Sequence, residues 1–240
     1  MRVMTFNIQH GLDYKNQIID LSLFSRYVGA QNVDFCALNE VRGEGNWEGY
    51  TDQTGFFVKE LGHSGFFGEA IKVAGTNPYG NAFLTRYTVR SAEVVHIPDS
   101  DDRSEDVHYE HRCAIRAVVD VDKTDVMFIV CHMGLAKTEA ENAVRTLCEL
   151  LDETDLPAVV MGDFNHTAES EVLAPLFERL SDTDSLSGKK GVYTFPSYDP
   201  REKIDYILYR GLDCTFALVK EDIVSDHFPI IAELNVIKTE

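Results

Sequence analysis

The sequence predicts an α+β fold of four layers, in which two mixed β-sheets pack face to face and helices cover their outer faces. Two observations lead to this prediction. The chain contains about a dozen strand-like runs, more than one sheet of ordinary size holds, with only a few helical stretches between them. Of its 240 residues, 44% are hydrophobic, so the inner faces of two packed sheets can form a sizeable core.

The N-terminal half of the chain alternates strands with two helical stretches. Apolar residues three and four positions apart predict a helix over Gln17–Ala30, and a short helix is expected over Gln53–Leu61. The strands expected in this half are Arg2–Asn7, Val33–Leu38, Gly65–Val73, Asn81–Arg86, Ser91–Ile97 and Cys113–Val121.

The C-terminal half contains two further helical stretches. Thr138–Leu151 has an apolar side that predicts an amphipathic helix, and Glu169–Leu180 is expected to form a second one. Ala158–Met161 is short and continuously apolar, which is typical of a strand at a sheet centre. The hairpin signal Asp122-Lys123-Thr124-Asp125 precedes the strand Val126–His132. The remaining strands are Ile204–Tyr209, Cys214–Val219 and Phe228–Val236.

Composition favours a single domain over residues 1–240, because no linker, repeat or low-complexity stretch divides the chain. Lys and Arg total 22 against 40 Asp and Glu, a formal charge of −18. This balance disfavours nonspecific binding to nucleic acid, although a local basic groove or a metal-neutralised site stays compatible with it. The five cysteines are widely spaced, without a CxxC pair, and are expected to be reduced. Because no signal peptide or apolar membrane span is found, we expect a cytoplasmic protein that does not bind membranes and for which no protein partner is implied.

Polar motifs follow several of the hydrophobic runs, at the point where each run ends. Strand ends on one edge of a sheet can bring residues distant in sequence into one cleft. Carboxylates, amides and a histidine gathered there are the groups that metal-assisted phosphoryl chemistry requires. The sequence therefore predicts a metal-dependent phosphoester hydrolase. The motifs are Thr5-Phe6-Asn7, Leu38-Asn39-Glu40, Gly162-Asp163-Phe164-Asn165 and Ser225-Asp226-His227.

Together with Ile204-Asp205-Tyr206, these motifs resemble the endonuclease/exonuclease/phosphatase superfamily, the deoxyribonuclease-I-like fold, in its bacterial form. The resemblance covers nearly the whole chain, and the motifs occur in the family's order. It implies the four-layer αββα sandwich and hydrolysis by in-line attack of water at phosphorus. The implied cofactor is Mg²⁺, with Mn²⁺ as an alternative.

A metal ligand is expected at Glu40, since a hard divalent cation prefers carboxylate oxygens. The resemblance implies that Asp226 also contributes to metal binding, directly or through water. The amide of Asn7 binds metal water or holds Glu40 in place. The alternative for Glu40 is a surface residue at a strand end, and that for Asn7 is an amide that satisfies a buried turn. The family usually carries Gln where this chain has Asn39.

The resemblance implies that Asp163 orients and deprotonates the attacking water and that Asn165 donates to the phosphoryl oxygens. The two residues are two positions apart, so in an extended stretch both side chains point to the same side. The alternative is a turn after the strand, which Asp and Asn both favour.

The resemblance assigns His227 to the scissile phosphate and Asp205 to fixing the tautomer and charge of that histidine. His132, at the end of its strand, stabilises the phosphate or protonates the leaving oxygen. Asp205 has an alternative as a structural partner of Lys203 or Arg201.

Two substrate-binding residues carry over with less specific motifs. Asn81 lies in a stretch similar to the family's Gly-Asn-Ala strand, and Arg112 resembles an arginine that engages a substrate phosphate. The alternatives are that Asn81 caps a turn and that Arg112 pairs with Glu110.

The catalytic set leaves the substrate open among nucleic acid, lipid, inositol phosphate and small phosphoesters, because specificity lies in loops. The reaction favoured is of phosphodiesterase or nuclease type, and the alternative is a phosphomonoesterase acting on a small soluble, inositol or sugar phosphate. A noncatalytic binding module on the same fold is a remote third possibility, and a zinc hydrolase lacks a HExxH-type ligand spacing. The loops expected to set specificity are Gly43–Thr54, Pro98–His111 and Gly188–Pro200.

Overall fold

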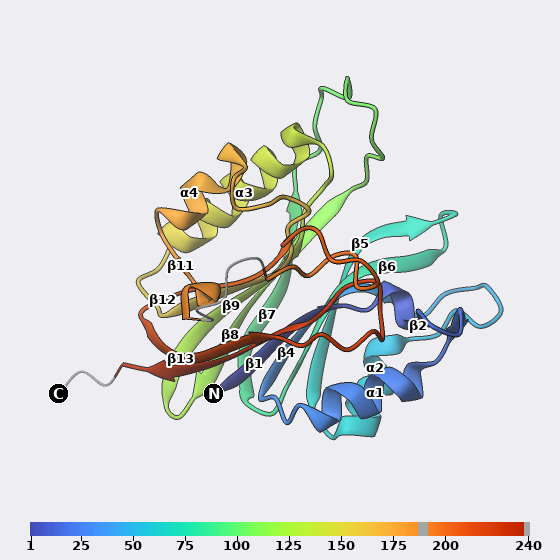
Figure 1. Ribbon diagram of the computed structural model, residues 1–240, viewed down its shortest axis with the longest axis horizontal. Helices are drawn as coiled ribbons and strands as arrows, with labels where there is room; N and C mark the ends of the chain where they lie inside the picture. Colours follow the sequence, from blue (N-terminus) through green and yellow to red (C-terminus); the bar gives the residue numbers. More distant parts are fainter. Residues whose placement is uncertain (187–191, 238–240) are drawn as a thin grey trace.

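The computed structural model describes residues 1–186 and 192–237, which form two β-sheets with helices outside them (Figure 1). Parallel pairing joins β1 to β4, and all other pairs in the first six-stranded sheet are antiparallel. The strands, in order across this sheet, are β13 (Leu212–Val219), β14 (Ile230–Val236), β1 (Arg2–Asn7), β4 (Phe35–Arg42), β6 (Asn77–Thr85) and β5 (Ser64–Val73).

The second sheet also has six strands, and its single parallel pair is β10 with β9. Asp122 and Lys123 form the turn between β8 and β9 with φ of 52° and 71°, the left-handed conformation of a tight hairpin. The strands, in order, are β11 (Ser181–Asp182), β12 (Asp205–Arg210), β10 (Ala158–Asp163), β9 (Thr124–His132), β8 (Arg112–Val121) and β7 (Thr88–Ile97).

The helices lie on opposite outer faces of the sandwich (Figure 1). Helices α1 (Leu21–Ala30) and α2 (Gln53–Leu61) cover the first sheet, and α3 (Lys137–Asp152) and α4 (Ala174–Phe177) cover the second. A separate apolar core fills the space between the sheets, where the rings of Phe35 and Phe128 stack with centroids 3.9 Å apart. The predicted four-layer architecture is therefore confirmed. Short elements complete the described chain: the strand pair β2 (Leu12–Asp13) and β3 (Ile18–Ile19), and the 3₁₀ turns η1 (Gln9–Gly11), η2 (Glu171–Leu173) and η3 (Thr183–Leu186).

Two of the predicted helices have the wrong extent. The helix expected over Gln17–Ala30 begins only at Leu21, because Asp20 caps it by accepting a hydrogen bond from the Leu23 amide at 2.9 Å. The helix expected over Glu169–Leu180 is divided into η2 and α4, and Pro175 lies in the first turn of α4, where proline is tolerated. Residues 188–191 of the third predicted specificity loop lie outside the described residues.

The five cysteines are all free thiols, as expected. Cys36 and Cys131 are fully buried in strands, and burial raises the pKa of both thiols. They pack as small hydrophobic side chains. No described helix is long and apolar enough to cross a membrane.

Candidate active site

Strand register brings the polar motifs to one end of the sandwich. In the first sheet, Asn7 at the end of β1 lies beside Asn39 of β4. In the second sheet, Asp163 at the end of β10 lies between His132 of β9 and Asp205 of β12. The Asn7 amide joins the two sheets, because its Nδ2 donates to Asp163 Oδ2 at 3.0 Å.

Glu40 is held in one orientation by two donors. Its backbone has φ of 59°, an uncommon conformation for a residue with a long side chain, at the irregularity where β4 leaves register with β6. Its Oε1 accepts from Asn7 Nδ2 at 3.0 Å, and its Oε2 accepts from the Tyr79 hydroxyl at 2.8 Å. The bulge and the two donors together fix the carboxylate at the cleft.

Asp226 supplies a second carboxylate on the same side of the site. Its Oδ1 accepts from Ser225 Oγ at 3.0 Å. Burial raises the pKa of Asp226, and the neighbouring negative charge of Glu40 adds to the rise, against the opposing effect of His227. A divalent cation would stabilise the charge that Asp226 carries beside a second carboxylate, and oxygen donors suit Mg²⁺. Glu40 and Asp226 therefore fit the expected metal ligands, with Asn7 bracing Glu40.

A different trio, Asp163, Asp205 and His227, also has potential ligand atoms within 4.8 Å of one another. Here, however, the histidine lies between the two carboxylates and pairs with both of them. His227 Nδ1 lies 2.9 Å from Asp205 Oδ2, and its Nε2 lies 3.6 Å from Asp163 Oδ2. An imidazole whose two nitrogens both face carboxylates has no lone pair to offer a metal. We therefore interpret this trio as a charge-paired catalytic group and not as the metal site.

His227 carries a positive charge in this arrangement. Burial alone would lower its pKa, but the carboxylates of Asp205 and Asp163 outweigh burial and raise the pKa to about 10. The ring of Phe195 packs against the imidazole, with centroids 4.7 Å apart, and limits its contact with water. The imidazolium is thus fixed in place for contact with an anionic group.

The alternative partners of Asp205 are wrong for this structure. Lys203 instead binds Asp182 at 2.5 Å and Asp184 at 3.4 Å. Arg201 pairs with Asp199.

Asp163 lies at the centre of the cluster and is 1% exposed. One of its oxygens accepts from Asn7 Nδ2 at 3.0 Å, and the other accepts from the backbone N–H of Asn165 at 2.9 Å. Burial raises the pKa of Asp163 to about 7, and the charge of His227 and these two hydrogen bonds limit the rise. A carboxylate with a pKa near the working pH is well matched to accepting a proton from water.

Asn165 reaches the site through a turn, so the expectation of an extended stretch is wrong. Its φ is 56°, and its backbone N–H donates to the side chain of Asp163, which closes the turn. Its Nδ2 donates to Met133 O at 2.9 Å and lies 3.1 Å from His132 Nε2. The turn that the sequence offered as an alternative to function therefore places the side-chain amide of Asn165 beside His132.

His132 is a neutral imidazole. Its pKa lies well below the ordinary histidine value because the ring is buried and faces the positive charges of Arg112 and His227. A neutral Nε2 can accept the hydrogen bond that the Asn165 amide donates. His132 and His227 therefore differ in charge although both lie within 3.6 Å of Asp163.

Arg112 and Asn81 lie beside His132 but already have protein partners. Arg112 Nη2 pairs with Glu110 Oε2 at 3.3 Å, while its buried Nε makes no hydrogen bond within the described part of the chain. Asn81 uses both ends of its amide, because Nδ2 donates to Cys113 O at 3.0 Å and Oδ1 accepts from Asn39 at 2.8 Å. The substrate-binding roles of the two residues stay predictions.

Two residues of the site were not found from sequence, Tyr79 and Phe195. Tyr79 lies two positions before Asn81 on β6, so the strand period of two places both on one face. That signal could have identified Tyr79. Phe195 lies in a loop with no periodicity, and no comparable signal points to it.

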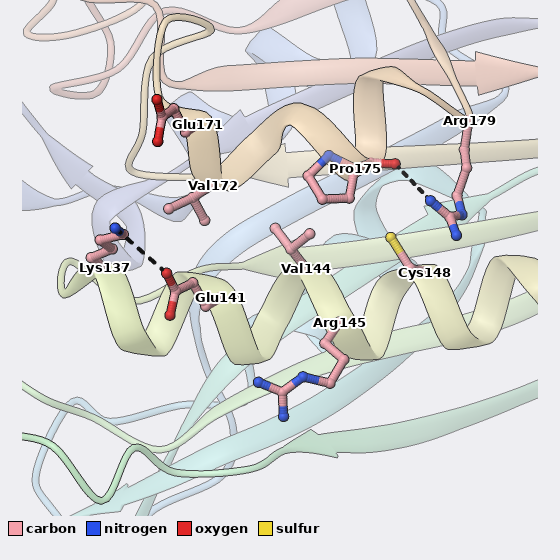
Figure 2. Close-up of a pocket in the computed structure, with 9 residues that line it drawn as sticks. All are labelled: Lys137, Glu141, Val144, Arg145, Cys148, Glu171, Val172, Pro175 and Arg179. Atoms are coloured by element: carbon pink, nitrogen blue, oxygen red, sulfur yellow. Dashed lines mark hydrogen bonds and ion pairs between the residues drawn. The ribbon is translucent and has the colours of Figure 1, made fainter.

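A hollow of about 540 Å³ lies between α3 and the segment that contains η2 and α4 (Figure 2). Val144 and Cys148 of α3 face Val172 and Pro175 across it, and Lys137 and Glu141 form an ion pair at one end. None of the polar strand-end residues lines it. The active site is therefore placed at the strand ends by its chemistry, not by cavity size.

The model of the endonuclease/exonuclease/phosphatase family matches residues 4–227. The chain belongs to this family. Its members are hydrolases of phosphoester bonds that generally depend on divalent metal ions. A comparison with curated proteins finds no match.

Solved structures with the same fold cover nearly the whole chain. An endonuclease/exonuclease/phosphatase from Beutenbergia cavernae has a TM-score of 0.81 at 20% identity, over 98% of this chain and 71% of its own. A mannosyl-6-phosphatase from Bacteroides thetaiotaomicron has a TM-score of 0.77 at 16% identity, over 98% and 99%. The human Nocturnin catalytic domain, with bound sulfate, has a TM-score of 0.75 at 18% identity, over 98% and 93%. At these identities the comparison supports the shared fold.

Proposed function

We propose that this protein is a metal-dependent phosphodiesterase of nuclease type, in which Asp163 activates the attacking water. The observation that carries the proposal is the environment of Asp163. Its carboxylate has a pKa of about 7 and lies within 3.6 Å of His132 Nε2 and His227 Nε2. A base of that pKa, with a neutral and a charged imidazole beside it, fits proton abstraction next to a bound phosphate.

Each site residue has a separate role in an in-line displacement at phosphorus. Asp163 orients a water and takes its proton as the oxygen attacks phosphorus. His227, charged and held by Asp205, stabilises the negative charge on the non-bridging oxygens. The side-chain amide of Asn165 joins it by turning one of its two N–H groups from His132 or Met133 to the phosphate. His132 completes the phosphate contact through its imidazole.

Mg²⁺ or Mn²⁺ would be held by Glu40 and Asp226, with Asn7 and Tyr79 fixing the Glu40 carboxylate. A divalent ion there supplies Lewis-acid polarisation of a phosphoryl oxygen.

A phosphomonoesterase acting on a small soluble phosphate is the second candidate. The −18 charge of the chain favours it, because a polyanionic substrate would be repelled over most of the surface. The pairing of Arg112 with Glu110 points the same way, since it reduces the positive charge near the cleft.

Hydrolysis of bis(p-nitrophenyl) phosphate, measured beside p-nitrophenyl phosphate, separates the two candidates. After treatment with EDTA we expect no turnover, and Mg²⁺ or Mn²⁺ should restore it where Zn²⁺ does not. Preference for the diester supports the main proposal, and preference for the monoester supports the second candidate. Turnover of either substrate that persists in EDTA would contradict both.

A further inference from the structure

An aromatic pair lies beside the proposed metal ligand Asp226 and takes no part in the site described above. The rings of Tyr14 and Tyr198 stack with centroids 6.0 Å apart and planes within 15° of parallel. Tyr198 is 63% exposed, which is unusual for a large side chain that already has a stacking partner. Because Tyr14 covers one face of the Tyr198 ring, the other face is open to solvent.

Both tyrosines are anchored to the segment that carries the catalytic residues. The Tyr14 amide donates to Val224 O at 3.0 Å. Ser197, the residue before Tyr198, donates through its amide to Asp226 O at 2.7 Å and through its hydroxyl to Ser225 O at 2.6 Å. The pair is therefore attached to the same backbone stretch as Asp226.

Each tyrosine also lies on a turn that is braced by its own hydrogen bonds. Asp13 accepts from the amides of Lys15 and Asn16 at 2.9 and 3.2 Å, which fixes the turn around Tyr14. On the other side, the Asp199 amide donates to Pro196 O at 3.1 Å, which closes the turn around Tyr198. A rigid aromatic surface loses little conformational entropy when a ligand stacks on it.

The same backbone contacts place the pair at the Asp226 edge of the cleft. Tyr14 is hydrogen-bonded to Val224, two residues before Asp226, and Tyr198 follows Ser197, which is hydrogen-bonded to Asp226 itself. A phosphoester bound at the Glu40–Asp226 side of the cleft would place its organic group near these rings.

We propose that Tyr14 and Tyr198 form a subsite for the base of a small nucleotide phosphodiester, a deeper assignment that rests on the proposed function. A nucleobase is flat and uncharged and presents a π-face to the open ring of Tyr198. A small nucleotide is also repelled less than a long one by this chain of formal charge −18, because it carries few phosphates. A long nucleic acid would meet that charge along its length.

The test compares binding of AMP, the nucleoside monophosphate part of such a diester, with binding of ribose 5-phosphate, which has a hydroxyl where AMP has its base. Isothermal titration calorimetry on the Asp163→Asn variant with Mg²⁺ keeps both ligands intact. We expect AMP to bind about tenfold more tightly or better, which is the scale of one base stacked on an aromatic side chain. Tyr198→Leu should remove that difference and leave ribose 5-phosphate binding unchanged, while Tyr198→Phe should keep it.

Tyr193→Leu is the matched control, since Tyr193 is 43% exposed in the same loop and has no ring neighbour among the described residues. Equal affinity for the two ligands, loss of both affinities in Tyr198→Leu, or no measurable binding of AMP would each overturn the subsite. Turnover of the p-nitrophenyl diester by the wild-type chain is measured separately. Failure of that turnover with base-dependent binding retained would count against the proposed hydrolysis and not against the subsite.

Discussion

At the residue scale, the site consists of side chains that hold one another through specific hydrogen bonds. Asn7 donates to both Glu40 and Asp163, so one amide positions a proposed metal ligand and the proposed base. Tyr79 approaches Glu40 from the other side. Such outer partners orient ligands and tune their affinity for metal.

Tyr79→Phe should weaken Mg²⁺ binding about tenfold, because the change removes only the hydroxyl that fixes Glu40 Oε2. Calorimetric titration with Mg²⁺ measures the effect. Tyr27→Phe is the matched control, since the Tyr27 hydroxyl also donates to a carboxylate, Asp222 at 3.4 Å, but outside the site. Equal Mg²⁺ affinities for wild type and Tyr79→Phe would show that the hydroxyl does not support the metal ligand.

His132 should remain neutral at pH 7 and carry its proton on Nδ1. Burial and the charges of Arg112 and His227 lower its pKa, and Nε2 is occupied as an acceptor from Asn165. Nitrogen chemical shifts in a ¹⁵N-edited NMR spectrum distinguish this tautomer from the imidazolium. An imidazolium signal for His132 at pH 7 would contradict the assignment of a neutral ring.

The sequence motifs identified the polar residues that the structure brings together, because each motif sits at a strand end where little else would be polar. Tyr79 and Phe195 were missed for a physical reason. An aromatic residue in a strand or loop is usually part of a core, and its contact with Glu40 or His227 depends on tertiary packing that a single run of residues does not reveal.

At the element scale, the close approach of β10 and β9 requires a glycine. Gly162 has φ of 145°, and a Cβ there would lie 1.8 Å from the carbonyl oxygen of Cys131. The two strands deliver Asp163 and His132 in register only because this side chain is absent.

Gly162→Ala should destabilise the protein by about 4 kcal/mol or prevent folding, because backbone atoms of two central strands must separate. Urea denaturation measures the loss. Gly75→Ala is the control, since Gly75 also has a positive φ, 76°, but a Cβ there meets nothing within 4 Å. Its cost should be about 1 kcal/mol. Similar costs for the two variants would contradict the close approach.

The elements also show where sequence patterns are insufficient. The long strands of both sheets were found because their apolar runs are bounded by turns, whereas the two-residue strand β11 was missed. The start of the first helix was placed too early, since apolar spacing continues through Ile18, which lies in a strand that pairs with Leu12 and Asp13. Spacing alone does not distinguish a helix turn from a short, exposed strand.

At the scale of the whole molecule, the site depends on both sheets. Asn7 and Glu40 come from the first sheet, and Asp163, Asp205 and His132 come from the second. The core between the sheets, in which Phe35 stacks on Phe128, therefore sets the distance between the proposed metal ligand and the proposed base.

Phe128→Ala should lower kcat at least tenfold in the folded protein, because a shift of about 1 Å between catalytic groups is costly. Phe57→Ala is the control, since Phe57 is equally buried but belongs to the outer core under α2. Both changes should cost about 3–5 kcal/mol of stability. Loss of kcat in both variants to the same extent, measured well below their melting temperatures, would show that sheet spacing has no special role.

The central claim is that Asp163 activates water, and the most direct measurement is kcat of the Asp163→Asn variant with a diester substrate and Mg²⁺. The amide keeps the size of the side chain but cannot accept the proton, so we expect kcat to fall about 10³-fold while the melting temperature and Mg²⁺ affinity stay near those of the wild type. A kcat within a few-fold of the wild-type value, in a folded and metal-loaded variant, would contradict the account.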